Sequence, residues 1–193
     1  MKRICVYCGS SPGRQELYVQ SARSLGKVLV AQGLELVYGG ARIGVMGAVA
    51  DQVLSLGGVV TGIMPQALVD KEVAHQGLSK LHVVGSMHER KMLMAELSDG
   101  FIALPGGFGT LEEIFEVLTW NQLGFHQKPC GLLNIGGYYD HLATFLNHSV
   151  QEQFVKQQSR EMLMVEDRPE TLLKAFDAYR APVVNQWIHH NQT

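Results

Sequence analysis

The sequence contains little proline, and its positive and negative charges are nearly balanced. Its 193 residues contain 6 Pro against 21 Gly, and no proline-rich, repetitive or low-complexity segment divides the chain. Lys plus Arg total 16 and Asp plus Glu total 18, so the formal net charge is -2. Because binding to a phosphate backbone depends on clustered Lys and Arg, nucleic acid is not expected as the primary partner.

Long hydrophobic runs and disulfide-forming cysteines are also scarce. The longest uncharged run, 52–69, contains Gly57, Gly58 and Pro65, so it does not predict a membrane span and no membrane partner is expected. The N-terminus enters a short apolar strand directly, without the apolar core or cleavage site of a signal peptide. Three cysteines cannot all pair, and a chain of this size needs no disulfides to fold, so we expect a cytoplasmic location.

The cysteine and histidine patterns do not predict a metal or redox site. Cys5 and Cys8 match a CxxC spacing, but they lie within a predicted buried strand, where no helix N-terminus lowers the thiol pKa. No second CxxC or spaced histidine pair completes a zinc site. His75, His82 and His88 are interpreted as polar packing residues, and we expect neither a metal nor an organic cofactor.

Apolar segments rich in β-branched residues alternate with amphipathic segments along the chain. Most of the former are apolar on both faces, which predicts buried strands at Ile4–Cys8, Leu34–Tyr38, Val59–Met64, Leu81–Val84, Phe101–Leu104, Gly131–Ile135 and Met162–Val165. Helical periodicity predicts helices at Gln15–Gln32, Gly44–Leu56, Met87–Ser98, Leu111–Leu123, Tyr139–Phe154 and Pro169–Tyr179. This alternation predicts an α/β fold: a doubly wound, mostly parallel sheet of about seven strands with helices on both faces. One domain is expected over 1–182, followed by a flexible tail at 183–193.

Three predicted strands are followed by glycine-rich loops. The loops are Gly9–Gly13, Gly39–Gly47 and Pro105–Thr110. Glycine lets backbone N–H groups approach an anion, and in parallel sheets ligands bind beyond the carboxyl ends of the strands. Each loop taken alone is equally consistent with a tight strand-to-helix turn, and neither standard phosphate-binding motif is present. Three such loops at one edge favour a nucleotide-sized ligand that carries a phosphate.

The segment after the third loop carries a cluster of acids at the start of a predicted helix. Thr110 and Glu113 have the spacing of a capping box, in which Thr110 is the N-cap. Glu112 and Glu113 are expected to stay ionised, because the helix dipole favours negative charge in the first turn. A carboxylate beside a phosphate-binding loop can stabilise cationic character in a sugar ring or activate a water molecule. Capping and catalysis are therefore both open for Glu113.

Another predicted helix begins with two cations after a second capping box. Ser86 and Glu89 form the box, and Arg90 and Lys91 follow in the first turns, where the helix dipole disfavours positive charge. Arg90 shares a helical face with apolar residues and should point inward. This combination favours a bound anion or an acidic partner for Arg90 over a solvated surface position.

These segments together resemble the LONELY GUY (LOG) family of phosphoribohydrolases, once labelled possible lysine decarboxylases. The stretch 105–113 matches the family motif PGGxGTxxE, and 87–91 matches its second signature. Tyr38-Gly39-Gly40 with Gly44–Gly47 is similar to the family's YGGG…GLMG loop, although Ala41 replaces one glycine. The similarity extends from about Ile4 to Phe154.

The resemblance implies a Rossmann-like homodimer, with larger even-numbered oligomers open, that hydrolyses the N-glycosidic bond of a purine nucleoside 5′-monophosphate. The products would be the free base and ribose 5-phosphate. Arg90 and Glu113 correspond to the two catalytic residues, and Arg90 could hold the phosphate or polarise the leaving base. The expected substrate-binding residues are Ser10, Glu72, Arg90, Lys91, Gly106, Gly107, Phe108, Gly109, Thr110, Glu112, Glu113 and Thr119. Whether the base carries an isoprenoid group or is plain adenine stays open.

Two other functions are weighed against this one. Molybdenum-cofactor carrier proteins share the fold and its glycine loops, so a non-catalytic binding protein is the alternative. The presence of both Arg90 and Glu113 argues against a pure carrier. The old decarboxylase label would require pyridoxal phosphate on a lysine, and no lysine has a recognisable setting for that cofactor.

Overall fold

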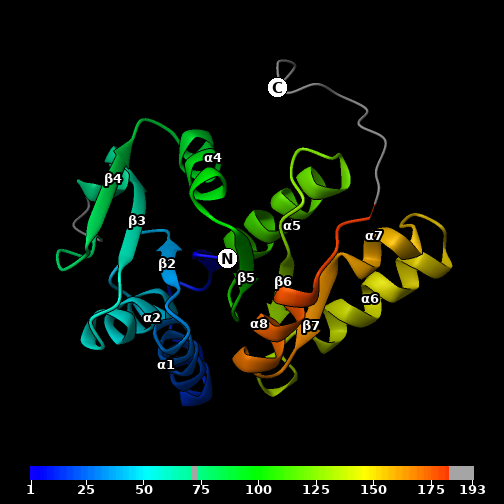
Figure 1. Ribbon diagram of the computed structural model, residues 1–193, viewed down its shortest axis with the longest axis horizontal. Helices are drawn as coiled ribbons and strands as arrows, with labels where there is room; N and C mark the ends of the chain where they lie inside the picture. Colours follow the sequence, from blue (N-terminus) through cyan, green and yellow to red (C-terminus); the bar gives the residue numbers. More distant parts are fainter. Residues whose placement is uncertain (71–73, 183–193) are drawn as a thin grey trace.

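The computed structural model describes residues 1–70 and 74–182, in which a seven-stranded sheet lies between two layers of helices (Figure 1). The strands are β1 (Arg3–Tyr7), β2 (Glu35–Tyr38), β3 (Val60–Pro65), β4 (Lys80–Val84), β5 (Gly100–Ala103), β6 (Cys130–Leu133) and β7 (Leu163–Glu166). The helices are α1 (Glu16–Ala31), α2 (Gly44–Ser55), α3 (Gln66–Val69), α4 (Met87–Leu97), α5 (Phe108–Gln122), α6 (Asp140–Gln151), α7 (Gln157–Glu161) and α8 (Pro169–Ala178), with a 3-10 helix η1 (Ile135–Gly137).

All neighbouring strands pair in parallel, in the order β4-β3-β2-β1-β5-β6-β7. The chain adds β2, β3 and β4 on one side of β1 and then returns to add β5, β6 and β7 on the other. The order therefore reverses between β1 and β5, where Tyr7 lies opposite Ala103. Ligands of such sheets bind beyond the carboxyl ends of the strands at this reversal, so the loops after β1 and β5 meet at the expected place.

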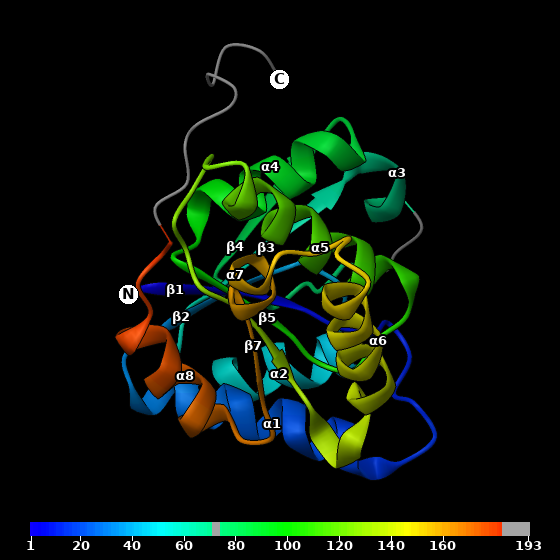
Figure 2. The same ribbon diagram turned by 90° about the vertical axis from the view of Figure 1, so that its right-hand side faces the viewer.

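Alternate side chains of the central strand β1 enter two separate cores. Ile4 and Val6 belong to a cluster that includes residues of α1, α2 and α8, whereas Cys5 and Tyr7 belong to one with α4, α5 and α6. Figure 2 shows α1, α2 and α8 on one side of the sheet and α4 and α5 on the other. Burial on both faces explains why the central strands β1, β5 and β6 are largely apolar, whereas the edge strand β4 contains Lys80 and His82 and is mostly exposed. Within 1–70 and 74–182, no helix is long and apolar enough to cross a bilayer.

The predicted doubly wound α/β fold is confirmed, and each predicted strand overlaps an observed one. The main error concerns α5, which begins at Phe108 and not at Leu111. The short segments α3, η1 and α7 were not predicted, because three to five residues show too little periodicity. The predicted tail, 183–193, lies outside the described residues.

Gly47 offers a test of packing against helix propensity. A Cβ added at Gly47, in the first turn of α2, would overlap the carbonyl oxygen of Arg42. Alanine is favoured over glycine in a helix by about 1 kcal/mol. We nevertheless expect Gly47→Ala to lower the free energy of unfolding by about 1–3 kcal/mol, because the backbone must shift to relieve this contact. Urea denaturation measures the change.

The matched control is Gly109→Ala in the first turn of α5, where an added Cβ would meet no atom within 4 Å. This substitution should leave the free energy of unfolding unchanged or raise it. Equal stability of the two variants would contradict the packing argument.

Candidate active site

The loops after β1 and β5 contact each other closely at the carboxyl edge of the sheet. The Gly9 N–H donates to the Pro105 carbonyl oxygen at 3.2 Å. A Cβ at Gly106 would lie 2.8 Å from the Gly9 nitrogen and would overlap Thr110 Oγ1, so only glycine fits there. A cavity of about 310 Å³ opens beside these loops, lined by Gly9, Ser10, Ser11, Pro12, Gly13, Tyr18, Val45, Pro105, Gly106, Gly107 and Tyr138.

The N-terminus of α5 differs from the sequence prediction. Its N-cap is Gly107, which makes no side-chain capping hydrogen bond, and Thr110 is the third helical residue. The predicted capping box of Thr110 and Glu113 is therefore wrong. The glycine-rich stretch hides the helix start, because its residues have low helix propensity and no apolar period. Glu113 consequently lies in the second turn, where its carboxylate is free for another role.

Two glycines in this segment are not required by the packing of the described residues. A Cβ at Gly107 or Gly109 would meet no atom within 4 Å, and neither residue has a positive φ. Phe108 between them is 93% exposed. The N-cap and the first turn of α5 are therefore unobstructed at Gly107 and Gly109, an arrangement that lets an anion approach backbone N–H groups at a helix N-terminus.

Arg90 on α4 and Glu113 on α5 form a buried ion pair. Arg90 Nη1 lies 3.0 Å from Glu113 Oε1, and each residue is 8% exposed. Arg90 Nε also donates to the carbonyl oxygen of Ile63 in β3 at 3.1 Å. Gly39, at the end of β2, lies so near that a Cβ there would overlap Arg90 Nη2. The guanidinium is thus held at the carboxyl ends of β2 and β3, and the predicted inward orientation of Arg90 is confirmed.

The ion pair sets the ionisation of Glu113. Burial raises the pKa of the Glu113 carboxyl, the positive charge of Arg90 opposes this, and the pKa stays raised overall. Glu113 does not lie in the first turn of α5, where the helix dipole was expected to lower its pKa, and burial raises the pKa instead. A buried carboxylate with a raised pKa is a better proton acceptor than an exposed one, which suits a general base.

Lys91 pairs with two other carboxylates of α5. Its Nζ lies 2.5 Å from Glu112 Oε1 and 2.9 Å from Glu116 Oε1. Burial lowers the pKa of this ammonium group, but hydrogen bonds to the two carboxylates raise it more, so the pKa of Lys91 is raised overall. Lys91 therefore ties α4 to α5 next to the Arg90–Glu113 pair and does not line the cavity.

The N-terminus of α4 has half of the predicted capping box. Ser86 Oγ accepts from the Glu89 N–H at 3.1 Å, as predicted. The Glu89 carboxylate instead accepts from the N–H of Gly85 at 2.7 Å, one residue before the N-cap. This cap fixes the start of α4 one turn before Arg90.

The other predicted site residues lie in several places. Ser10 lines the cavity, together with Gly106 and Gly107, whereas Arg90 and Glu113 do not line it. Thr119 Oγ1 donates to the carbonyl oxygen of Phe115 within α5. Glu72 lies outside the described residues.

Some cavity residues were not predicted from the sequence. They include Tyr18, Val45 and Tyr138. Tyr138 follows Gly136 and Gly137 of η1, in the segment after β6, so a fourth glycine-containing segment after a strand was the available signal.

The CxxC cysteines are buried and carry no sign of thiolate chemistry. Cys5, Cys8 and Cys130 are free thiols, and burial raises the pKa of Cys5 to about 12. Among residues 1–70 and 74–182, no group of three His, Cys, Asp or Glu side chains is arranged to hold a metal ion.

Solved structures with the same fold include two proteins that handle the molybdenum cofactor. The molybdenum cofactor binding protein of Rippkaea orientalis superposes with a TM-score of 0.70 at 23% identity, covering 92% of this chain and 97% of its own. The molybdenum cofactor carrier protein of Chlamydomonas reinhardtii gives a TM-score of 0.67 at 22% identity, covering 92% of this chain and 99% of its own. At these identities the likeness shows the fold alone.

Sequence relatives are closer. The cytokinin riboside 5′-monophosphate phosphoribohydrolase of Rhodococcoides fascians is 50% identical, over 85% of this chain and 83% of its own. The cytokinin riboside 5′-monophosphate phosphoribohydrolase LOG5 of Arabidopsis thaliana is 48% identical, over 93% of this chain and 78% of its own. The family model described as possible lysine decarboxylase matches residues 46–176. On this similarity in sequence and fold, the chain belongs to the LONELY GUY family.

Proposed function

We propose that this protein hydrolyses the N-glycosidic bond of a purine nucleoside 5′-monophosphate, either a cytokinin riboside 5′-monophosphate or AMP. The products are the free base and ribose 5-phosphate. Relatives that are 46–50% identical over most of the chain are named cytokinin riboside 5′-monophosphate phosphoribohydrolases. The observation that carries the proposal is the buried Arg90–Glu113 pair beside a glycine loop that opens α5.

The glycine loop binds the 5′-phosphate. Gly107 and Gly109 leave the first turn of α5 unobstructed, so backbone N–H groups and the helix dipole can both stabilise the phosphate charge. Thr110, buried against Gly106, holds the loop to the helix. Binding energy from the phosphate then positions the ribose for reaction at C1′.

Glu113 acts on the ribose and on the attacking water. The C1′–N bond breaks, its electron pair leaves with the base, and positive charge develops at C1′ in an oxocarbenium-like transition state. The Glu113 carboxylate stabilises this charge and accepts a proton from the water whose oxygen bonds to C1′. The departing base gains a proton, so one water molecule is consumed in all. Arg90 holds Glu113 in place and favours its charged form.

Two alternatives are less well supported. A carrier of the molybdenum cofactor would share the fold, but a carrier has no need of a buried carboxylate with a raised pKa. A pyridoxal phosphate enzyme needs a nucleophilic amine, whereas Lys91 is paired with two carboxylates and its pKa is raised. A homodimer in the cytoplasm is part of the same proposal.

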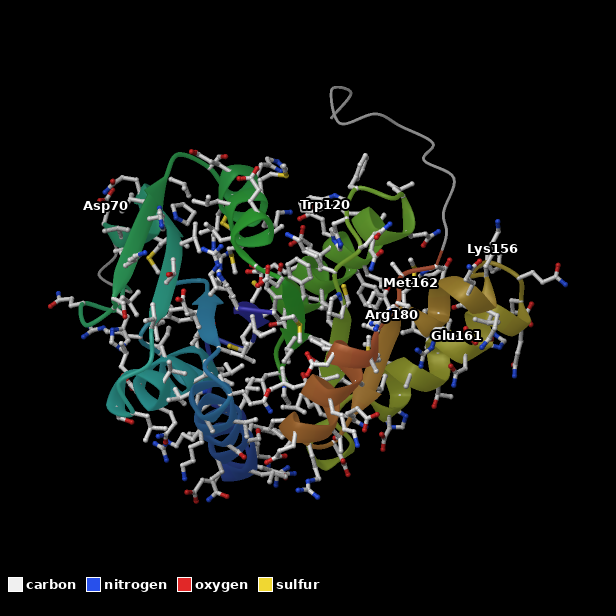
Figure 3. All side chains as sticks on the ribbon, in the orientation of Figure 1. Asp70, Trp120, Lys156, Glu161, Met162 and Arg180 are labelled. Atoms are coloured by element: carbon white, nitrogen blue, oxygen red, sulfur yellow. The ribbon has the colours of Figure 1, made fainter. Side chains whose placement is uncertain are left out.

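The decisive experiment is chromatographic detection of free base after incubation with AMP and with isopentenyladenosine 5′-monophosphate. Glu113→Gln should reduce base release roughly 10²-fold or more, because the amide can neither accept a proton nor balance the charge at C1′. Glu161→Gln is the matched control, since this exposed residue lies on α7, distant from the glycine loops (Figure 3). No release from either nucleotide, with nucleotide binding retained, would favour the carrier.

The pH dependence follows from the raised pKa of Glu113. The reaction needs the carboxylate, so kcat/KM should fall as the pH drops through that pKa. Arg90→Met removes the charge that opposes the effect of burial, so the acidic limb of the profile should move to higher pH. Arg90→Lys keeps a charge and should shift the limb less. An unmoved limb in Arg90→Met would mean that another group titrates.

Gly109→Ala separates phosphate binding from folding. The added methyl group meets no protein atom, so the variant should be at least as stable as the unmodified protein. It projects at the first turn of α5, where we place the phosphate, so KM for AMP should rise about tenfold, as for the loss of one charge-assisted hydrogen bond. Steady-state kinetics and urea denaturation measure the two effects. An unchanged KM would place the phosphate elsewhere.

A further inference from the structure

Two consecutive tyrosines after β6 bind the backbone of the loop after β5. The Tyr139 hydroxyl donates to the Leu104 carbonyl oxygen at 2.7 Å, and the Tyr138 hydroxyl donates to that of Gly106 at 2.6 Å. The Pro105 carbonyl oxygen between them accepts from the Gly9 N–H at 3.2 Å. Three successive carbonyl groups of the glycine loop are therefore held by neighbouring segments.

The turn that carries these tyrosines is itself firmly built. Gly136 and Gly137 have φ values of 59° and 74°, a conformation that favours glycine. Asn134 Oδ1 accepts from the Tyr139 N–H at 2.7 Å, and Asn134 Nδ2 donates to Asp140 Oδ1 at 2.7 Å. The rings of Tyr138 and Tyr139 meet edge to face, with centroids 4.9 Å apart. Both hydroxyls are thus presented to the loop in fixed positions.

Holding a carbonyl group also orients the N–H of the next residue. In a trans peptide the C=O and N–H bonds lie in one plane and point in opposite directions. The hydrogen bond from Tyr138 to the Gly106 carbonyl therefore turns the Gly107 N–H away from Tyr138. The Leu104 carbonyl held by Tyr139 precedes Pro105, which has no N–H. The two tyrosines hence differ: only the Tyr138 bond orients a donor.

We propose that Tyr138 is a positioning residue that aims the Gly107 N–H at the 5′-phosphate of the substrate. This inference rests on the proposed function, because it assigns the N–H group to the phosphate of that same site. Tyr138 is 42% exposed and lines the cavity, whereas Tyr139 is 2% exposed. Tyr139 accordingly supports the end of β5, and Tyr138 serves the ligand.

The test compares Tyr138→Phe with Tyr139→Phe, which each lose one hydroxyl and one hydrogen bond to the same loop. Tyr138→Phe should raise KM for AMP about fivefold, the equivalent of one hydrogen bond, while kcat changes less than about twofold. The Kd of ribose 5-phosphate, measured by titration calorimetry, should rise in parallel. Tyr139→Phe should lower the urea midpoint, because it leaves a buried carbonyl unpaired, without this loss of affinity.

Two outcomes overturn the inference. Unchanged KM and Kd in Tyr138→Phe, with a fully active unmodified protein, would overturn it and leave the proposed function intact. Equal loss of affinity in both variants would show that the hydroxyls only support the loop. If the unmodified protein released no base from any nucleotide, the proposed function would fail, and calorimetric titration with AMP would still decide the role of Tyr138.

Discussion

The buried ion pair of Arg90 and Glu113 is the contact on which the rest of the site depends. Neither charge could be buried alone without a large desolvation cost, so each residue requires the other. Their pairing in turn requires glycine at position 39 and the carbonyl oxygen of Ile63. A pair of this kind adds little to stability, yet it fixes a carboxylate with a raised pKa at one place, which is what catalysis at a sugar carbon needs.

The neighbouring contacts serve the same end by holding the two helices that carry the pair. Lys91 connects α4 to Glu112, the residue before Glu113, and to Glu116, about one turn after it on α5. The two helices pack on the face of the sheet that includes Cys5 and Tyr7 of β1. Because the pair, the lysine contacts and the core all lie on this face, a shift of either helix would disturb the carboxylate directly.

The backbone supplies the second half of the site, and it does so through glycine. At position 106 glycine is required by the packing of the protein itself, since Thr110 and Gly9 leave no room for a Cβ. At Gly107 and Gly109 no such reason exists among the described residues, and a ligand accounts for them better. The tyrosines after β6 complete this half of the site, because their hydroxyl groups fix the orientation of the Leu104 and Gly106 carbonyl groups by hydrogen bonds.

Much of this protein followed from its sequence alone. The strands, the main helices and the parallel sheet were predictable because strands buried on both faces are apolar throughout, and the family was predictable because its motifs are local. The tertiary structure alone decided that Glu113 is no capping residue, that it pairs with Arg90, and that Tyr138 contacts the loop 32 residues before it. These facts depend on where a glycine-rich helix begins and on which strands are neighbours, and no local pattern of residues encodes either.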